Sequence, residues 1–91
     1  MSPRSKVKFR LYVAGDAQNS TKALLNLTAL CNEYLPDRHE IEIVNVLREQ
    51  ARALADGILM TPTLIKIAPL PMRKIVGTLS QKQRVLAALG L

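Results

Sequence analysis

The first half of the chain switches between two hydrophobic periods, and this switch restricts the fold more than any other feature. In residues 7–14 apolar side chains occupy every second position, which predicts a strand with one apolar face. In residues 24–34 they recur three and four places apart, which predicts a helix. The β-branched residues 41–47 then predict a second strand, which we expect inside the sheet. A helical connection of this length makes the two strands parallel, with a right-handed crossover.

Local signals place the start of this helix and the environment of a cysteine. Asn19 or Ser20 is expected to cap the helix N-terminus. Cys31 belongs to the apolar stripe and has no basic residue beside it in the sequence, so we expect a core residue rather than a reactive thiol. A single cysteine excludes an internal disulfide and a cysteine-based metal site.

The second half predicts a short helix followed by a hairpin. The helix lies within residues 48–57, with Ala51, Leu54 and Ala55 on its apolar side and Gly57 at its C-terminal end. Residues 63–68 and 72–77 follow as two strands that are close enough in sequence to pair.

A final helix completes the pattern. Ser80 and Gln83 fit a capping box at its start, and Gly90 follows its last turn. The order strand, helix, strand, helix, strand, strand, helix predicts a single α/β domain over residues 1–91 with the layout of a thioredoxin-like fold.

Pro62 interrupts the otherwise apolar segment "ILMTPTLIKI". Proline cannot donate a hydrogen bond to a sheet, so within sheets it is confined to edges, first residues and bulges. We therefore expect the strand to begin at Thr63, with Pro62 shaping the loop before it, and a cis Thr61–Pro62 bond is one way to do so.

The residues that catalysis requires are missing from the places where this layout would put them. A thioredoxin-like oxidoreductase needs a thiolate in the loop after the first strand, near a helix N-terminus, and the loop here reads "GDAQNS". His39 is the single histidine and lies in a charged turn, where we expect it to be exposed. We predict no enzymatic activity, no cofactor and no metal.

The charge is unevenly distributed along the chain. The formal net charge is +6, and no acidic residue follows Asp56, whereas several Lys and Arg residues do. A basic C-terminal third favours an acidic partner, although the same residues also suit a solvated surface. The three aromatic residues are too few for nucleic-acid stacking, so a nucleic-acid-binding module remains only an alternative. Without an apolar segment long enough to span a membrane, we expect a soluble, cytoplasmic protein that binds no membrane.

Five segments together resemble the KaiB family, and they extend over nearly the whole chain. They are "LYVAG" at 11–15, "NSTKALLNL" at 19–27, "TPTL" at 61–64, "APLPMRKIVGTLS" at 68–80 and "VLAALGL" at 85–91. The resemblance implies a binding protein rather than an enzyme, which docks on a KaiC-type ATPase and thereby sequesters or displaces other clock proteins, among them KaiA and a kinase with a thioredoxin-like domain. It implies partner binding by the basic residues Lys22, Lys66, Arg73 and Lys74.

The resemblance also implies two alternative folds. One is the thioredoxin-like form that binds KaiC, and the other is a tetramer with the order strand, helix, strand, strand, helix, helix, strand. The resemblance and the local sequence assign the change of fold to Thr61, Pro62, Thr63, Pro69, Pro71, Gly77, Ala88 and Gly90. Alanine in place of a mid-helix glycine favours a helix by about 1 kcal/mol, so Ala88 favours the thioredoxin-like form, which we expect as a monomer. A tetramer or dimer is the alternative, as is a stress-related member of the family that does not bind clock KaiC.

Overall fold

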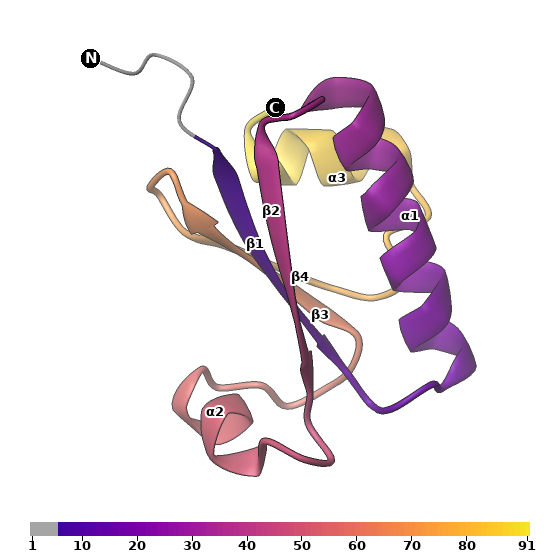
Figure 1. The fold of residues 1–91 in the computed structure, drawn as a ribbon, viewed down its shortest axis with the longest axis vertical. Helices are drawn as coiled ribbons and strands as arrows, with labels where there is room; N and C mark the ends of the chain where they lie inside the picture. The colour runs from indigo at the N-terminus through magenta and orange to yellow at the C-terminus, as the bar shows by residue number, and fades with distance from the viewer. Residues whose placement is uncertain (1–5) are drawn as a thin grey trace.

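In residues 6–91, the part of the chain that this computed structural model describes, four strands form one sheet with helices on both faces (Figure 1). In chain order the elements are β1 (Val7–Val13), α1 (Gln18–Tyr34), β2 (His39–Asn45), α2 (Gln50–Ala55), β3 (Thr63–Ala68), β4 (Arg73–Val76) and α3 (Lys82–Leu89). The order predicted for the thioredoxin-like form is confirmed, and it is not the order of the alternative form. Residues 1–5, which the predicted domain includes, lie outside the described residues.

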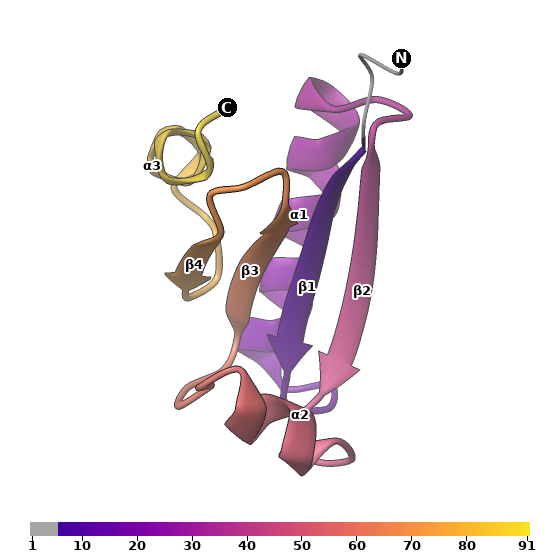
Figure 2. The same ribbon diagram turned by 90° about the vertical axis from the view of Figure 1, so that its left-hand side faces the viewer.

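The strands lie in the order β2, β1, β3, β4 (Figure 2). β1 and β2 are parallel, with Val7 opposite His39 and Val13 opposite Asn45, so the predicted parallel unit is confirmed. β3 runs antiparallel to both β1 and β4. The prediction that the second strand lies inside the sheet is wrong, because among the described residues β2 pairs with β1 alone. The β-branched residues of β2 have only β1 as a neighbouring strand, and Val44 among them is fully buried.

α1 and α3 cover one face of the sheet and enclose the main core (Figure 1). Phe9, Leu11 and Leu64 from the strands pack there against Leu27 and Leu89 from the helices, all at 2 % exposure or less. The predicted cap of α1 is wrong. Its N-cap is Ala17, and no side chain caps the helix. The Ser20 hydroxyl instead accepts a hydrogen bond from the Ala14 N–H at 3.1 Å, which fixes the turn between β1 and α1.

α2 lies on the opposite face, over a small core of four buried residues (Figure 2). These residues are Tyr12, Val44, Ala53 and Ile65. The predicted apolar side of α2 is wrong, since Ala53 is buried while Leu54 is 78 % exposed. A helix of six residues makes fewer than two turns, so its periodicity does not define a face. Tyr12 lies on the face of β1 that carries Arg10, and it is fully buried because α2 covers that face at this position.

The last helix begins later than predicted, and the expected capping box is absent. The N-cap of α3 is Gln81, without a side-chain hydrogen bond, and Ser80 accepts one from the Thr78 hydroxyl instead. Leu79 has a φ of 61° and is buried, so the chain turns there before the helix can start. At the other end, Gly90 is confirmed as the C-cap, in the left-handed conformation at φ 73°.

The structure of the loop before β3 explains how Pro62 fits beside a strand. β3 begins at Thr63, as predicted, and the Thr61–Pro62 bond is cis. The Thr63 hydroxyl donates to the Met60 carbonyl at 2.6 Å, and the Gly77 N–H donates to the Pro62 carbonyl at 2.9 Å. Pro62 cannot donate a hydrogen bond to the sheet, but its carbonyl accepts one across the β3–β4 pair. The bonds before Pro69 and Pro71 in the hairpin loop are also cis.

Candidate partner-binding surface

The position that holds the reactive thiol in a redox-active thioredoxin fold is occupied here by other residues. The loop between β1 and α1 contains Gly15, Asp16 and Ala17. Cys31 lies in the main core, as predicted, with no exposed surface. Burial raises the pKa of the Cys31 thiol to about 11, so the thiol is protonated at neutral pH. This cysteine is therefore a core residue without the properties of an attacking thiolate.

The segment from the end of α2 to β3 exposes three large apolar side chains. Leu54, Leu59 and Met60 are 78 %, 94 % and 63 % exposed, and we call them the α2 surface. Two pockets of about 190 and 240 Å³ flank the loop, and both are lined by Leu59 and Met60. Large apolar side chains exposed next to one another, as Leu59 and Met60 are, are typical of protein interaction sites.

Asp56 fixes this surface to the sheet. Its carboxylate accepts hydrogen bonds from the Tyr12 hydroxyl and from the Arg10 guanidinium, the latter at 2.9 Å. Its backbone carbonyl accepts a further hydrogen bond from Lys74 Nζ at 3.1 Å. The hydrogen bond from Tyr12, followed by that from Arg10, lowers the pKa of Asp56. Burial above all raises the pKa of Tyr12, which keeps its hydroxyl as the donor. The residue that precedes the exposed loop is therefore held by β1 and β4.

A second carboxylate ties the same helix to β2. Glu42 accepts from Arg10 Nε at 2.8 Å and pairs with Arg52 of α2 at 2.9 Å. The hydrogen bonds from Arg10 and Arg52 lower the pKa of Glu42. Arg52 also pairs with Glu49 at 3.2 Å. The result is a chain of alternating charges across β1, β2 and α2 that positions a helix with only one buried residue.

The structure does not bring the four predicted basic residues into one patch. Lys22 is exposed on α1, and Arg73 and Lys74 are exposed on opposite faces of β4. Lys66 is 6 % exposed, and its Nζ donates to the Leu89 carbonyl at 3.1 Å, where it holds the end of α3. Of the four, Lys74 lies beside the α2 surface and lines a pocket with Leu59 and Met60. Partner binding by these residues stays a prediction.

Sequence reasoning missed the charge network and the α2 surface, although the network has a readable signal. Lys8 and Arg10 alternate in one strand as Glu40 and Glu42 do in the next, and parallel pairing sets Lys8 opposite Glu40 and Arg10 opposite Glu42. The α2 surface has no such signal, because its leucines and methionine follow neither a strand period nor a helix period.

Residues 6–91 contain neither a helix that could span a membrane nor a cluster of metal-ligating side chains. None of the helices there is long and apolar enough to cross a membrane. The same residues contain no group of three or more histidine, cysteine, aspartate or glutamate side chains arranged to hold a metal ion.

The fold and the site together define a thioredoxin-like domain that lacks a thiol in the redox loop and displays an apolar surface beside α2. Solved structures support this class. The N-terminal domain of Synechococcus elongatus SasA superposes with a TM-score of 0.79 at 15 % identity, covering 99 % of this chain and 89 % of that domain. Mitochondrial thioredoxin 3 from Saccharomyces cerevisiae superposes with a TM-score of 0.74 at 15 % identity, covering 97 % and 81 %. At this identity the likeness concerns the fold.

The chain belongs to the KaiB family, because the family model described as the KaiB domain matches residues 10–91. It is 43 % identical over 91 residues to the circadian clock oscillator protein KaiB of Prochlorococcus marinus, covering all of this chain and 76 % of that protein. It is 41 % identical to the KaiB of Synechococcus elongatus, covering all of this chain and 89 % of that protein. The circadian clock protein KaiB3 of a Synechocystis species is 37 % identical over 87 residues, covering 96 % and 85 %. The resemblance seen in the sequence is confirmed.

Proposed function

We propose that the chain is a non-enzymatic regulator that docks on a KaiC-type ATPase through the α2 surface. The observation that carries this proposal is the exposure of Leu54, Leu59 and Met60 on a loop that Asp56 holds in place. Burial of apolar side chains favours association, and a surface fixed in advance loses little entropy on binding. Family membership supports the choice of a clock ATPase as the partner.

Charge contributes mainly to the rate of docking. Lys74 borders the α2 surface, and α1, which carries Lys22, begins at the same end of the molecule (Figure 1). Exposed cations steer an acidic partner and change the salt dependence of association, but each exposed pair adds only about 0.2–1 kcal/mol. Lys74 is therefore the basic residue whose loss should weaken docking most directly.

Docking in the thioredoxin-like form also provides a means of competition. The domain of SasA has the same fold, which supports a model in which this chain displaces a thioredoxin-like domain of a clock kinase and, in the complex, sequesters KaiA. The change to the tetrameric fold belongs to the same proposal. It is assigned to the half of the chain that contains Pro62, Pro69, Pro71 and Ala88.

The experiment compares two leucines that are exposed to a similar extent on opposite faces of the sheet. A KaiC-type ATPase with nucleotide is titrated with the wild-type chain and with the variants Leu54→Glu and Leu25→Glu. Leu54 belongs to the α2 surface, whereas Leu25 lies on α1 and is 65 % exposed. We expect Leu54→Glu to abolish binding and Leu25→Glu to leave it unchanged. Equal affinity of the two variants contradicts docking through the α2 surface.

A further inference from the structure

β4 is the second free edge of the sheet. Within residues 6–91 it pairs with β3 alone, so its outer side presents backbone groups to which another strand can add. The hydrogen bond from the Gly77 N–H to the Pro62 carbonyl continues the β3–β4 ladder by one residue. Because the direction of these groups alternates along an antiparallel ladder, the backbone of Ile75 faces β3, whereas the N–H and C=O groups of Lys74 and Val76 face outward.

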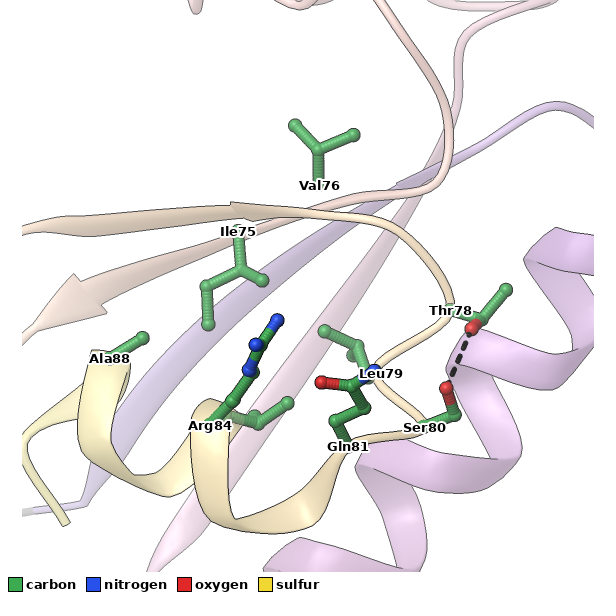
Figure 3. A pocket seen from close by; sticks show the side chains of 9 residues that line it. Ile75, Val76, Thr78, Leu79, Ser80, Gln81, Arg84 and Ala88 are labelled. Atoms are coloured by element: carbon green, nitrogen blue, oxygen red, sulfur yellow. Dashed lines mark hydrogen bonds between the residues drawn. The ribbon is translucent and has the colours of Figure 1, made fainter.

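A pocket of about 360 Å³ lies between this edge and α3 (Figure 3). Ile75, Val85 and Ala88 contribute apolar lining. In Figure 3 the side chains of Ile75 and Val76 point to opposite sides of β4, yet both residues line the pocket. A cavity that touches both residues reaches the outer edge of the strand. The pocket and the free edge therefore form one continuous surface, which we call the β4 groove.

The β4 groove is basic, and its cations have no counter-charge. Arg84 lines the pocket, and Arg73 lies on the same face of β4 as Ile75. No salt bridge in the described part of the chain involves either arginine, whereas Lys82 on the same helix pairs with Glu33 at 2.8 Å. The sequence after Asp56 contains no acidic residue that could neutralise them. A carboxylate from outside the chain is the complementary group, since arginine binds it with two parallel hydrogen bonds.

We propose that the β4 groove binds an extended acidic segment of a partner protein, which adds to the sheet beside β4. Its backbone pairs with the outward N–H and C=O groups of Lys74 and Val76. Side chains of an added strand alternate between faces, so the residue opposite Ile75 enters the pocket and the residue opposite Arg73 lies on the same face, two places away. The segment therefore has an apolar residue and an Asp or Glu two positions apart. The β4 groove adjoins the α2 surface at Lys74 and Val76, which line a pocket with Leu59 and Met60, but the proposal does not depend on docking through the α2 surface.

The other free edge of the sheet provides an internal comparison. β2 carries Glu40 and Glu42, whose carboxylates repel an acidic strand even though Lys8 and Arg10 pair with them. Charge thus directs an acidic segment to β4 rather than to β2. The backbone amide signals of both strands appear in one NMR spectrum, so binding at the two edges should be distinguishable.

The test uses a short synthetic peptide that alternates Thr and Val and carries one Glu two places after its central Val, with both ends blocked. A second peptide has Lys in place of the Glu. Each is titrated into the isotope-labelled full chain, and backbone amide signals are followed by NMR. We expect the Glu peptide to shift the amides of Lys74 and Val76 and to slow their hydrogen exchange. The Lys peptide should bind at least about tenfold more weakly, because charges that attract the Glu repel the Lys.

Three variants sharpen the assignment. Val76→Pro removes an outward N–H that β3 does not use, which an edge strand tolerates, and we expect it to abolish binding. Arg84→Glu should weaken binding about tenfold, whereas Arg48→Glu, the same charge change at an exposed residue before α2, should not. Because Arg84 is exposed on α3, that variant remains informative if Val76→Pro fails to fold.

Four results of the peptide titrations would overturn the proposal. They are shifts confined to the amides of His39–Asn45 in β2, equal binding of the two peptides, full binding by Arg84→Glu, and no shift at millimolar peptide. If a short single-stranded DNA binds the groove with the same dependence on Arg84 and the Glu peptide does not, the groove is a nucleic-acid site and strand addition is wrong.

Discussion

The two faces of the sheet are built from different kinds of interaction. The face under α1 and α3 is aliphatic, with a main core of buried side chains that includes Leu27 and Leu64. The face under α2 has a small core of four buried residues and depends on the carboxylates of Asp56 and Glu42 to hold the helix. Hydrophobic burial supplies most of the stability of a domain, whereas partly exposed ion pairs supply little. The comparison indicates that one face maintains the fold and the other displays the surface proposed to bind partners.

The largest expected effect comes from shortening one leucine on each face. Leu27→Ala in the main core should lower the free energy of unfolding by about 2–5 kcal/mol, because it leaves a cavity among packed side chains. Leu59→Ala removes the same atoms from a side chain that is 94 % exposed and should change the free energy by less than about 0.5 kcal/mol. Urea unfolding measures both, and similar losses would show that the two faces do not differ in this way.

Asp56→Asn tests the polar attachment of α2. The amide keeps the shape of the side chain but removes the negative charge that pairs with Arg10 and strengthens the hydrogen bond accepted from Tyr12. We expect a loss of about 1–3 kcal/mol, smaller than that of Leu27→Ala. Faster hydrogen exchange should be confined to α2 and the loop after it. Asp16→Asn, at an exposed residue of the loop before α1, is the matched control and should have no effect.

The pH dependence of unfolding should report the same carboxylate. The pKa of Asp56 is lowered from its ordinary value of 3.8, so the folded state favours the ionised form. Its contribution is fully present above about pH 5 and is lost as the pH falls through the depressed folded pKa. The difference in unfolding free energy between wild type and Asp56→Asn should therefore shrink from pH 5 towards pH 2. A constant difference would show that the charge of Asp56 is not what matters.

The smallest effect is expected at Lys66, and it separates a structural role from partner binding. Lys66→Met keeps the aliphatic part of the side chain and removes the amine that donates to the Leu89 carbonyl. A cation near a helix C-terminus typically contributes about 0.3–1 kcal/mol, so stability should fall modestly and α3 should exchange faster. Weaker binding of a KaiC-type ATPase with unchanged stability would instead assign Lys66 to partner binding.

The sequence predicted the elements better than their surroundings. The strand and helix periods of residues 7–34 follow from burial on one face, so the local sequence predicts both elements. The left-handed Gly90 could be predicted because it depends only on the φ angle of that residue. The edge position of β2 depends on where β3 pairs, which no residue of β2 encodes. The capping box at Ser80 failed because the burial of Leu79 turns the chain first.

The candidate site was less predictable than the fold because it is defined by tertiary contacts and by exposure. Lys66 and Lys74 cannot be told apart by their charge. In the structure Lys66 lies under α3, whereas Lys74 lies beside the α2 surface. Asp56 could be recognised only as the last acidic residue, since its partners Arg10 and Tyr12 are more than forty positions away. Exposure of Leu59 contradicts its residue type, so hydrophobicity alone would place it in a core.

The most direct test of the account is a hydrogen-exchange footprint of the chain alone and in complex with a KaiC-type ATPase and nucleotide. If the face under α2 binds partners and the other maintains the fold, protection on complex formation should concentrate in residues 54–60, and the exchange of α1 should be unchanged. Protection centred on α1 and α3, with residues 54–60 exchanging as in the free chain, would contradict the division between the two faces.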